Sequence, residues 1–234
     1  MTGGRGACRA DDRHVGERMT ISMDDLLNSI LESFDRIDYI KPEDIPNIDL
    51  YMDQVTTFMD KKLKSSARYP DEDKILTKTM INNYAKNHLL PSPERKKYSK
   101  EHILLLIFIY YYKGILSIGD IQTLLSPLME HYYKKESGLR LEEIYREVFS
   151  LEKTQIDALK CDITRKFETA QETFTDAQIP DEEREFLTQF AFICMLSFDV
   201  YTKKLLIEKM IDGMQRPQDH KKENRREEKK EKKD

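Results

Sequence analysis

LTKTMINNYAKNHLLPSPERKKYSKEHILLLIFIYYYKGILSIGDIQTLL, residues 76–125, is the stretch that decides the fold, because three separately capped helices can be predicted in it. Thr77 precedes a short helix whose apolar residues share one side. Ser99 precedes a helix that is apolar on almost every face, which is typical of a buried helix. Ser117 and Asp120 have the spacing of a capping box and open a third helix. The loop between the first two helices is basic.

Helices are also predicted on both sides of this stretch. Upstream, one amphipathic helix begins near Ser22, and a second follows after Pro42 and Pro46 have interrupted the first. Downstream, apolar residues recur at helical spacing over residues 144–174, and a last helix covers residues 181–211. Only eight glycines and eight prolines occur in 234 residues, too few for the turns of a many-stranded sheet. The sequence therefore predicts an all-α protein.

Charge is distributed unevenly along the chain. Residues 74–113, called the basic segment below, carry eight bases and two acids, a net charge of +6. Residues 19–73 and 114–215 each carry a net charge of −7. A basic segment between acidic flanks is typical of a surface that binds a polyanion, although a solvated charged face is an equally ordinary interpretation.

Several classes of protein are disfavoured by what the chain lacks. Its three cysteines, Cys8, Cys161 and Cys194, have neither disulfide-framework nor metal-ligand spacing. No uninterrupted apolar stretch is long enough to span a membrane, and no secretory leader is recognised, so a cytoplasmic protein is expected. We find no nucleophile–base pair, phosphate-binding glycine loop or paired carboxylates. No enzyme activity, cofactor or metal is therefore expected.

The segment INNYAKNHLLP, residues 81–91, resembles the second helix of the MerR family of winged helix–turn–helix regulators. Residues 96–103, KKYSKEHI, are similar to the wing and following helix of that family, and residues 117–121, SIGDI, are similar to a later turn. The likeness covers about fifty residues, with Asn82 and His88 where the family has Arg and Gly. The whole chain also resembles an uncharacterised bacterial domain family of unknown function, and that second resemblance names no activity.

The MerR resemblance implies a site for double-stranded DNA. Small polar and cationic residues near the start of a helix suit entry into a major groove, and basic residues of a wing suit phosphates. Tyr98 belongs to the wing, although a core tyrosine with its hydroxyl at the surface is the competing expectation. The expected DNA-binding residues are Thr77, Lys78, Thr79, Asn82, Asn83, Lys86, Arg95, Lys96, Lys97 and Tyr98.

These observations give an expected organisation. Residues 1–22 are expected to be disordered, with Met19 and Met23 as alternative starts of the native chain. An N-terminal helix over 23–46 and a MerR-like winged helix–turn–helix over 47–130 follow. Two long helices over 139–213 would dimerise the chain or house a pocket for a small-molecule effector, and a disordered charged tail occupies 214–234.

Two functions fit this organisation. The first is a homodimeric transcriptional regulator that reads DNA with residues 78–87 and with the basic wing at residues 95–98. The alternative is a protein-interaction module that keeps the winged-helix fold without binding DNA, which Asn82 in place of the family's Arg would favour.

Overall fold

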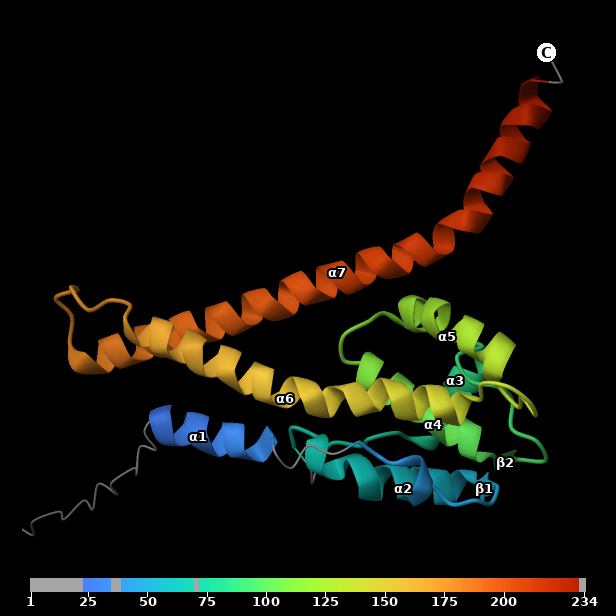
Figure 1. The fold of residues 1–234 in the computed structure, drawn as a ribbon, viewed down its shortest axis with the longest axis horizontal. Coiled ribbons are helices and arrows are strands. Elements are labelled where there is room, and N and C mark those ends of the chain that lie inside the picture. The colour runs from blue at the N-terminus through green and yellow to red at the C-terminus, as the bar shows by residue number, and fades with distance from the viewer. Residues whose placement is uncertain (1–22, 35–38, 70–71, 232–234) are drawn as a thin grey trace, which may run out of the picture. The chain divides into compact units, whose positions relative to one another are not determined.

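The computed structural model describes residues 23–34, 39–69 and 72–231, apart from the side chains of residues 66, 152–154 and 215–231 (Figure 1). The chain divides into two units, residues 1–36 and 37–234. The expectations for residues 1–22 and for a cap at Ser22 lie outside the described residues.

The first unit contains helix α1, Met23–Phe34. Its apolar residues recur at helical spacing, as the sequence predicts, and Asp24 and Asp25 in its first turn suit the positive end of the helix dipole. The expected helix over residues 23–46 is too long. Pro42 instead opens a short 3-10 turn, Pro42–Asp44, in the second unit, where its fixed φ fits the first position of a helical turn.

The second unit is mostly helical, so the all-α class is confirmed for the described residues (Figure 1). Its only strands among those residues, β1 (Leu50–Tyr51) and β2 (Lys97–Tyr98), are two residues long and pair antiparallel, with Leu50 opposite Tyr98. The elements follow in the order β1, α2 (Met52–Leu63), a 3-10 turn (Lys64–Ser66), α3 (Lys78–Lys86), β2, α4 (Lys100–Tyr112), α5 (Ile118–Tyr132), α6 (Leu141–Gln171) and α7 (Asp181–Glu231).

Helix α4 forms the centre of the core. Every residue from Ile103 to Ile109 is at most 3% exposed. The first turns of α6 cover it with an aromatic cluster in which Phe108 meets Tyr145 and Phe149 at ring-centroid distances of 5.4 and 5.3 Å. The Tyr145 hydroxyl donates to the Ile40 carbonyl at 2.8 Å, which attaches the segment before α2 to the same core. The predicted buried helix after Ser99 is confirmed, with its last residues, 110–112, only partly covered.

The predicted caps set the starts of three helices. The Thr77 hydroxyl accepts from the Met80 amide at 3.2 Å, and Ser117 and Asp120 form the reciprocal bonds of a capping box. At α4 the Ser99 amide donates to Nδ1 of His102 at 3.0 Å, so an imidazole takes the place that Glu or Gln usually has. Each cap satisfies an amide that the helix itself leaves without a partner.

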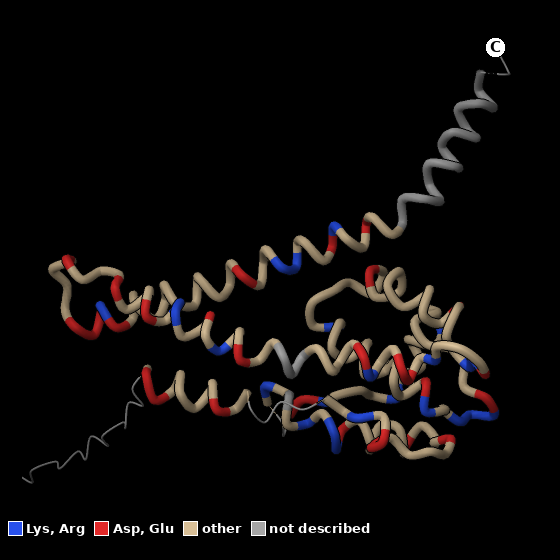
Figure 2. Tube along the Cα trace, viewed as in Figure 1, with Lys and Arg blue, Asp and Glu red and all other residues tan. Residues whose placement is uncertain are grey.

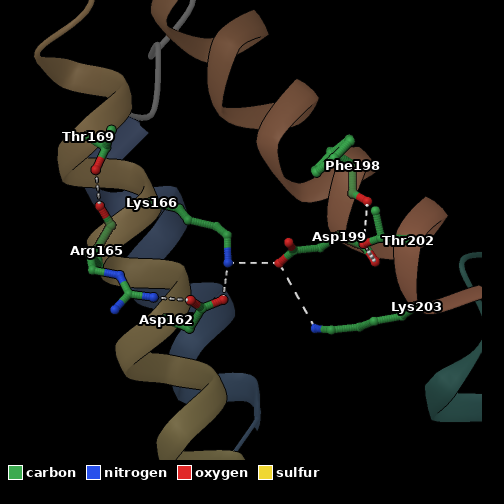
Figure 3. Close-up of polar contacts among 8 residues, drawn as sticks. All are labelled: Asp162, Arg165, Lys166, Thr169, Phe198, Asp199, Thr202 and Lys203. Carbon is green, nitrogen blue, oxygen red and sulfur yellow. Dashed lines mark hydrogen bonds and ion pairs between the residues drawn. The ribbon is translucent and has the colours of Figure 1, made fainter. Parts of the chain in front are cut away.

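Helices α6 and α7 are consecutive in the chain and pack against one another. The rings of Phe167 and Phe192 meet edge to face at 5.3 Å. Beside them the Lys166 ammonium pairs with Asp162 on its own helix and, at 2.7 Å, with Asp199 of α7 (Figure 3). This charged bridge within a largely apolar contact favours one register of the two helices.

Helix α7 extends further than expected. The sequence predicts an end near residue 213 and a disordered tail, but the helix continues to Glu231. The added segment is rich in Lys, Arg, Glu and Gln, residue types with high intrinsic helix propensity. Among the described helices, none combines the length and the apolar character needed to cross a bilayer.

Candidate nucleic-acid interface

Helix α3 divides cleanly between the core and the surface. Ile81 is fully buried and Tyr84 is 6% exposed, while Met80 is partly covered at the edge of the core. The residues on the opposite side are all exposed: Lys78, Thr79, Asn82, Asn83 and Lys86. Thr77 is half-buried and serves as the cap, with its hydroxyl oxygen accepting from the Met80 amide. The exposed side of α3 therefore offers two amides, a hydroxyl and two lysines.

A left-handed residue ends α3 and returns the chain to the core. His88 has φ 58°, its amide donates to the Ala85 carbonyl at 3.3 Å, and the Leu89 amide donates to the Tyr84 carbonyl at 2.9 Å. This pattern is a Schellman motif, in which glycine usually occupies the left-handed position. His88 is the position where the sequence resemblance expects glycine. Leu89 and Leu90 then enter the core, which fixes the direction of the following loop.

Residues 94–97 form a tight turn whose last residue, Lys97, is the first residue of β2. The Lys97 amide donates to the Glu94 carbonyl at 2.8 Å, and Arg95 and Lys96 have φ 48° and 65°. Two consecutive positive φ angles are the signature of a type I′ hairpin turn, which normally selects Asn and Gly. The side chains of Arg95 and Lys96 are exposed at its tip.

Tyr98 is wrongly included among the expected contact residues. Its side chain is 2% exposed, and its ring meets the His102 imidazole edge to face at 5.4 Å. Burial raises the pKa of Tyr98. Because Tyr98 is paired with Leu50 in the small sheet, alternation along the strand turns it inward and leaves Lys97 half-exposed.

Four of the eight Lys and Arg residues of the basic segment make contacts within the protein. Lys78 pairs with Asp53, Lys97 lies 5.3 Å from the Tyr51 ring centroid, and Lys100 pairs with Glu142 at 3.0 Å. The Lys113 ammonium donates to the Ile75 carbonyl at 2.8 Å, and burial lowers its pKa. Within the described ranges, the other four bases have no ion pair: Lys74, Lys86, Arg95 and Lys96. These four are the cations available to a polyanion.

Acidic residues collect elsewhere in the chain. Figure 2 shows Asp and Glu concentrated where α6 is connected to α7, and Lys and Arg at the turn before β2. Among the described residues, no group of three or more His, Cys, Asp and Glu side chains is placed to hold a metal ion. The positions of Cys161 and Cys194 on apolar helix faces predict buried thiols, but both side chains are exposed.

Two open grooves border α2. One, of about 380 Å³, lies between α2 and residues 74–78, and the other, of about 370 Å³, is lined by residues between Pro46 and Lys61. Neither is lined by α6 or α7, the region in which the sequence analysis places an effector pocket.

The sequence does not predict the polar network at the base of the 94–97 turn. His102 is 1% exposed, burial lowers its pKa, and its Nε2 lies 3.2 Å from the Tyr133 hydroxyl. The next residue, Lys134, contacts Glu94 through its side chain and Glu101 through its amide. These partners are more than thirty residues apart in sequence, so local spacing carries no signal of them.

Residues 40–148 match the model of a family described as a domain of unknown function (DUF1836). No curated protein and no solved structure matches the chain. The match bears out the resemblance to an uncharacterised family over these residues and not over the whole chain, and it names neither an activity nor a helix–turn–helix. It covers α2 to α5 and the first turns of α6, and it therefore contains both α3 and the 94–97 turn.

Proposed function

We propose that this chain is a transcriptional regulator that binds double-stranded DNA with a winged helix–turn–helix formed by α2, α3 and the 94–97 turn. The observation that carries the proposal is the partition of α3, whose apolar side chains enter the core while its amides, hydroxyl and lysines remain exposed. A recognition helix needs this arrangement, because it must be held rigidly on one side and read bases with the other.

The exposed residues of α3 suit base edges and phosphates. Asn82 and Asn83 can each donate to and accept from the major-groove edge of adenine. Lys86 is exposed one turn further along and can meet a phosphate. Lys78 is partly neutralised by Asp53, so it contributes less net charge than its position suggests. The proposed reading of bases therefore depends on the two asparagines.

Strain in the 94–97 turn supports its role as a wing. A non-glycine residue in the left-handed region costs on the order of 1 kcal/mol or more, and here two of them are adjacent. A turn selected for stability alone would carry Asn and Gly. The presence of Arg and Lys at the exposed tip is explained if their charges contact the DNA backbone.

The double variant Arg95→Asn/Lys96→Gly tests this proposal. It gives the type I′ turn its preferred residues and removes both charges, so folding should be preserved. We expect weaker binding to all duplex sequences, and a plot of log affinity against log salt that is flatter by roughly two units. Fluorescence anisotropy with labelled duplexes at several salt concentrations measures both quantities.

Two further variants separate base reading from general attraction. Asn82→Ala or Asn83→Ala should cost on the order of 1–3 kcal/mol on a selected site and much less on random DNA. Lys209→Ala, which removes an exposed charge from α7, should leave binding unchanged. If the unmodified chain shows no salt-sensitive binding to any duplex pool, the surface is a docking site for a protein, and the interaction-module alternative replaces this proposal.

We further propose that the regulator is a homodimer joined through α7. Large apolar side chains along its first half remain at least half exposed, including Phe186, Phe190, Ile193 and Phe198. Exposed apolar surface of this extent marks interfaces between proteins, and a second copy offers the same surface in return. A two-fold dimer would present two copies of α3 to paired DNA half-sites.

A further inference from the structure

Lys134 connects the end of α5 to the 94–97 turn. Its ammonium forms an ion pair with the Glu94 carboxylate, forty residues away in sequence. Its amide donates to both oxygens of Glu101, at 2.9 and 3.0 Å. The preceding residue places its hydroxyl 3.2 Å from Nε2 of His102. The connection after α5 is thus held against the first turn of α4, directly beside the turn that leads into β2.

The backbone at Lys134 is held in a conformation that this residue type rarely adopts. Its φ is 54°, in the left-handed region, where Gly and Asn are the usual residues. The two bonds to Glu101 and the contact of the half-buried Tyr133 hydroxyl with His102 hold the backbone on either side of this residue. The side chain is consequently directed at Glu94 by the fold and needs little further ordering to reach it.

Glu94 is the residue whose charge would oppose DNA at this turn. It immediately precedes Arg95 and Lys96, and its side chain is 73% exposed. The pair with Lys134 lowers the pKa of Glu94, so the carboxylate is ionised at neutral pH. An unpaired carboxylate beside two phosphate-binding cations would repel the same phosphates.

We propose that Lys134 is a positioning residue for the 94–97 turn, which holds and neutralises Glu94 so that Arg95 and Lys96 meet phosphates without an opposing charge. This inference rests on the proposed DNA-binding function. In this proposal Lys134 acts through Glu94 and does not contact DNA directly.

The test combines DNA affinity with a measurement on the free protein. Lys134→Asn keeps a residue that tolerates positive φ and removes the ammonium. It should weaken duplex binding about two- to fivefold, the range expected for an exposed ion pair. Lys134→Arg should restore binding. Lys135→Asn removes the same charge one residue later, where the side chain lies over Tyr132, and should have a smaller effect.

A double-mutant cycle decides how Lys134 acts. In a Glu94→Gln background, Lys134→Asn should have no further effect on affinity. If it weakens binding equally in both backgrounds, Lys134 contacts phosphates directly and the inference is wrong.

Hydrogen exchange of the Lys97 amide, which bonds to the Glu94 carbonyl, provides a measurement that does not require DNA. Exchange should accelerate in Lys134→Asn and Glu94→Gln but not in Lys134→Arg or Lys135→Asn. If the unmodified chain binds no DNA, the proposed function fails, and this exchange pattern still decides whether Lys134 holds the turn. An unchanged rate in Lys134→Asn would overturn the inference.

Discussion

Helices α4 and α7 are both apolar on nearly every face along part of their length, yet the chain covers α4 far more completely than α7. Residues 103–109 of α4 are at most 3% exposed, with α5, α6 and the small sheet around them. On α7, Phe192 is 8% exposed against Phe167, while Phe186 and Phe198 are more than 60% exposed. The same apolar sequence pattern therefore occurs in one helix that is buried and in another that is largely exposed.

The difference shows what the two regions need for stability. The segment from Ile40 to Phe149 has enough elements to enclose a helix on all sides. Helix α7 packs against α6 and α5, and Ile211 near its middle is buried, but these contacts cover only part of its surface. The exposed apolar residues in the first half of α7 can therefore be buried only by something beyond these contacts, which is the physical basis of the proposed dimer.

The largest expected effect is the loss of packing around α4. Leu105→Ala should lower the free energy of unfolding by about 2–5 kcal/mol, because Leu105 is fully buried and the truncation leaves a cavity. Phe198→Ala should change it by roughly 0.5 kcal/mol or less at high dilution, since most of that ring is already exposed. Urea unfolding followed by circular dichroism measures both.

Protein concentration sharpens this contrast. If α7 forms a dimer interface, the cost of Phe198→Ala should rise with concentration, while that of Leu105→Ala should not. Equal costs for the two variants at high dilution would mean that α7 is covered within a single chain.

The next effect concerns assembly. Phe190→Asp should convert a dimer to a monomer at micromolar concentration without loss of helix content, because it places a charge within the exposed apolar surface. Sedimentation equilibrium measures the mass. Gln189→Asp adds the same charge at the neighbouring exposed position, so a weaker effect there would assign the loss to the ring. A monomeric unmodified chain would refute the dimer proposal.

The helices between Ile40 and Phe149 were predictable because the sequence signals for them are local. A cap precedes its helix by one residue, and the spacing of Ile81 and Tyr84 fixes which side of α3 enters the core. The separation of buried from exposed residues on α3 follows from that spacing alone. The same logic assigns Lys78, Asn82 and Lys86 to the surface.

Features that depend on distant partners could not be predicted. The pairing of Leu50 with Tyr98 and of Glu94 with Lys134 joins residues about forty or more positions apart. A tyrosine can lie on either the buried or the exposed face of a strand, so the burial of Tyr98 cannot be predicted until the strand that pairs with it is known. The continuation of α7 to Glu231 was missed for a different reason, since charged residues with high helix propensity resemble a disordered tail in composition.

The smallest expected effect lies in the charged bridge between α6 and α7 (Figure 3). The Lys166 side chain is 16% exposed and joins Asp162 to Asp199, whereas the Lys203 side chain is 67% exposed and 4.0 Å from Asp199. Lys166→Met should lower the thermal midpoint, because Asp162 and Asp199 lose the ammonium between them and keep only the more exposed Arg165 and Lys203 as partners. Lys203→Met should leave the midpoint nearly unchanged, because an exposed pair contributes little.

The effect of Lys166→Met should depend on pH in a defined direction. The hydrogen bond from Lys166 lowers the pKa of Asp162 from its ordinary 3.8. A carboxyl whose pKa is lowered in the folded state stabilises the fold above its unfolded pKa, and this contribution is lost as the pH falls through the folded value. The difference in midpoint between the unmodified chain and Lys166→Met should therefore be full near pH 7 and shrink below about pH 4. Replacing Asp162 and Asp199 by Asn in the Lys166→Met background should recover much of the loss, because the two carboxylates that Lys166 joins are then neutral. A difference that persists unchanged into acid would instead assign the role of Lys166 to packing of its aliphatic stem against α7.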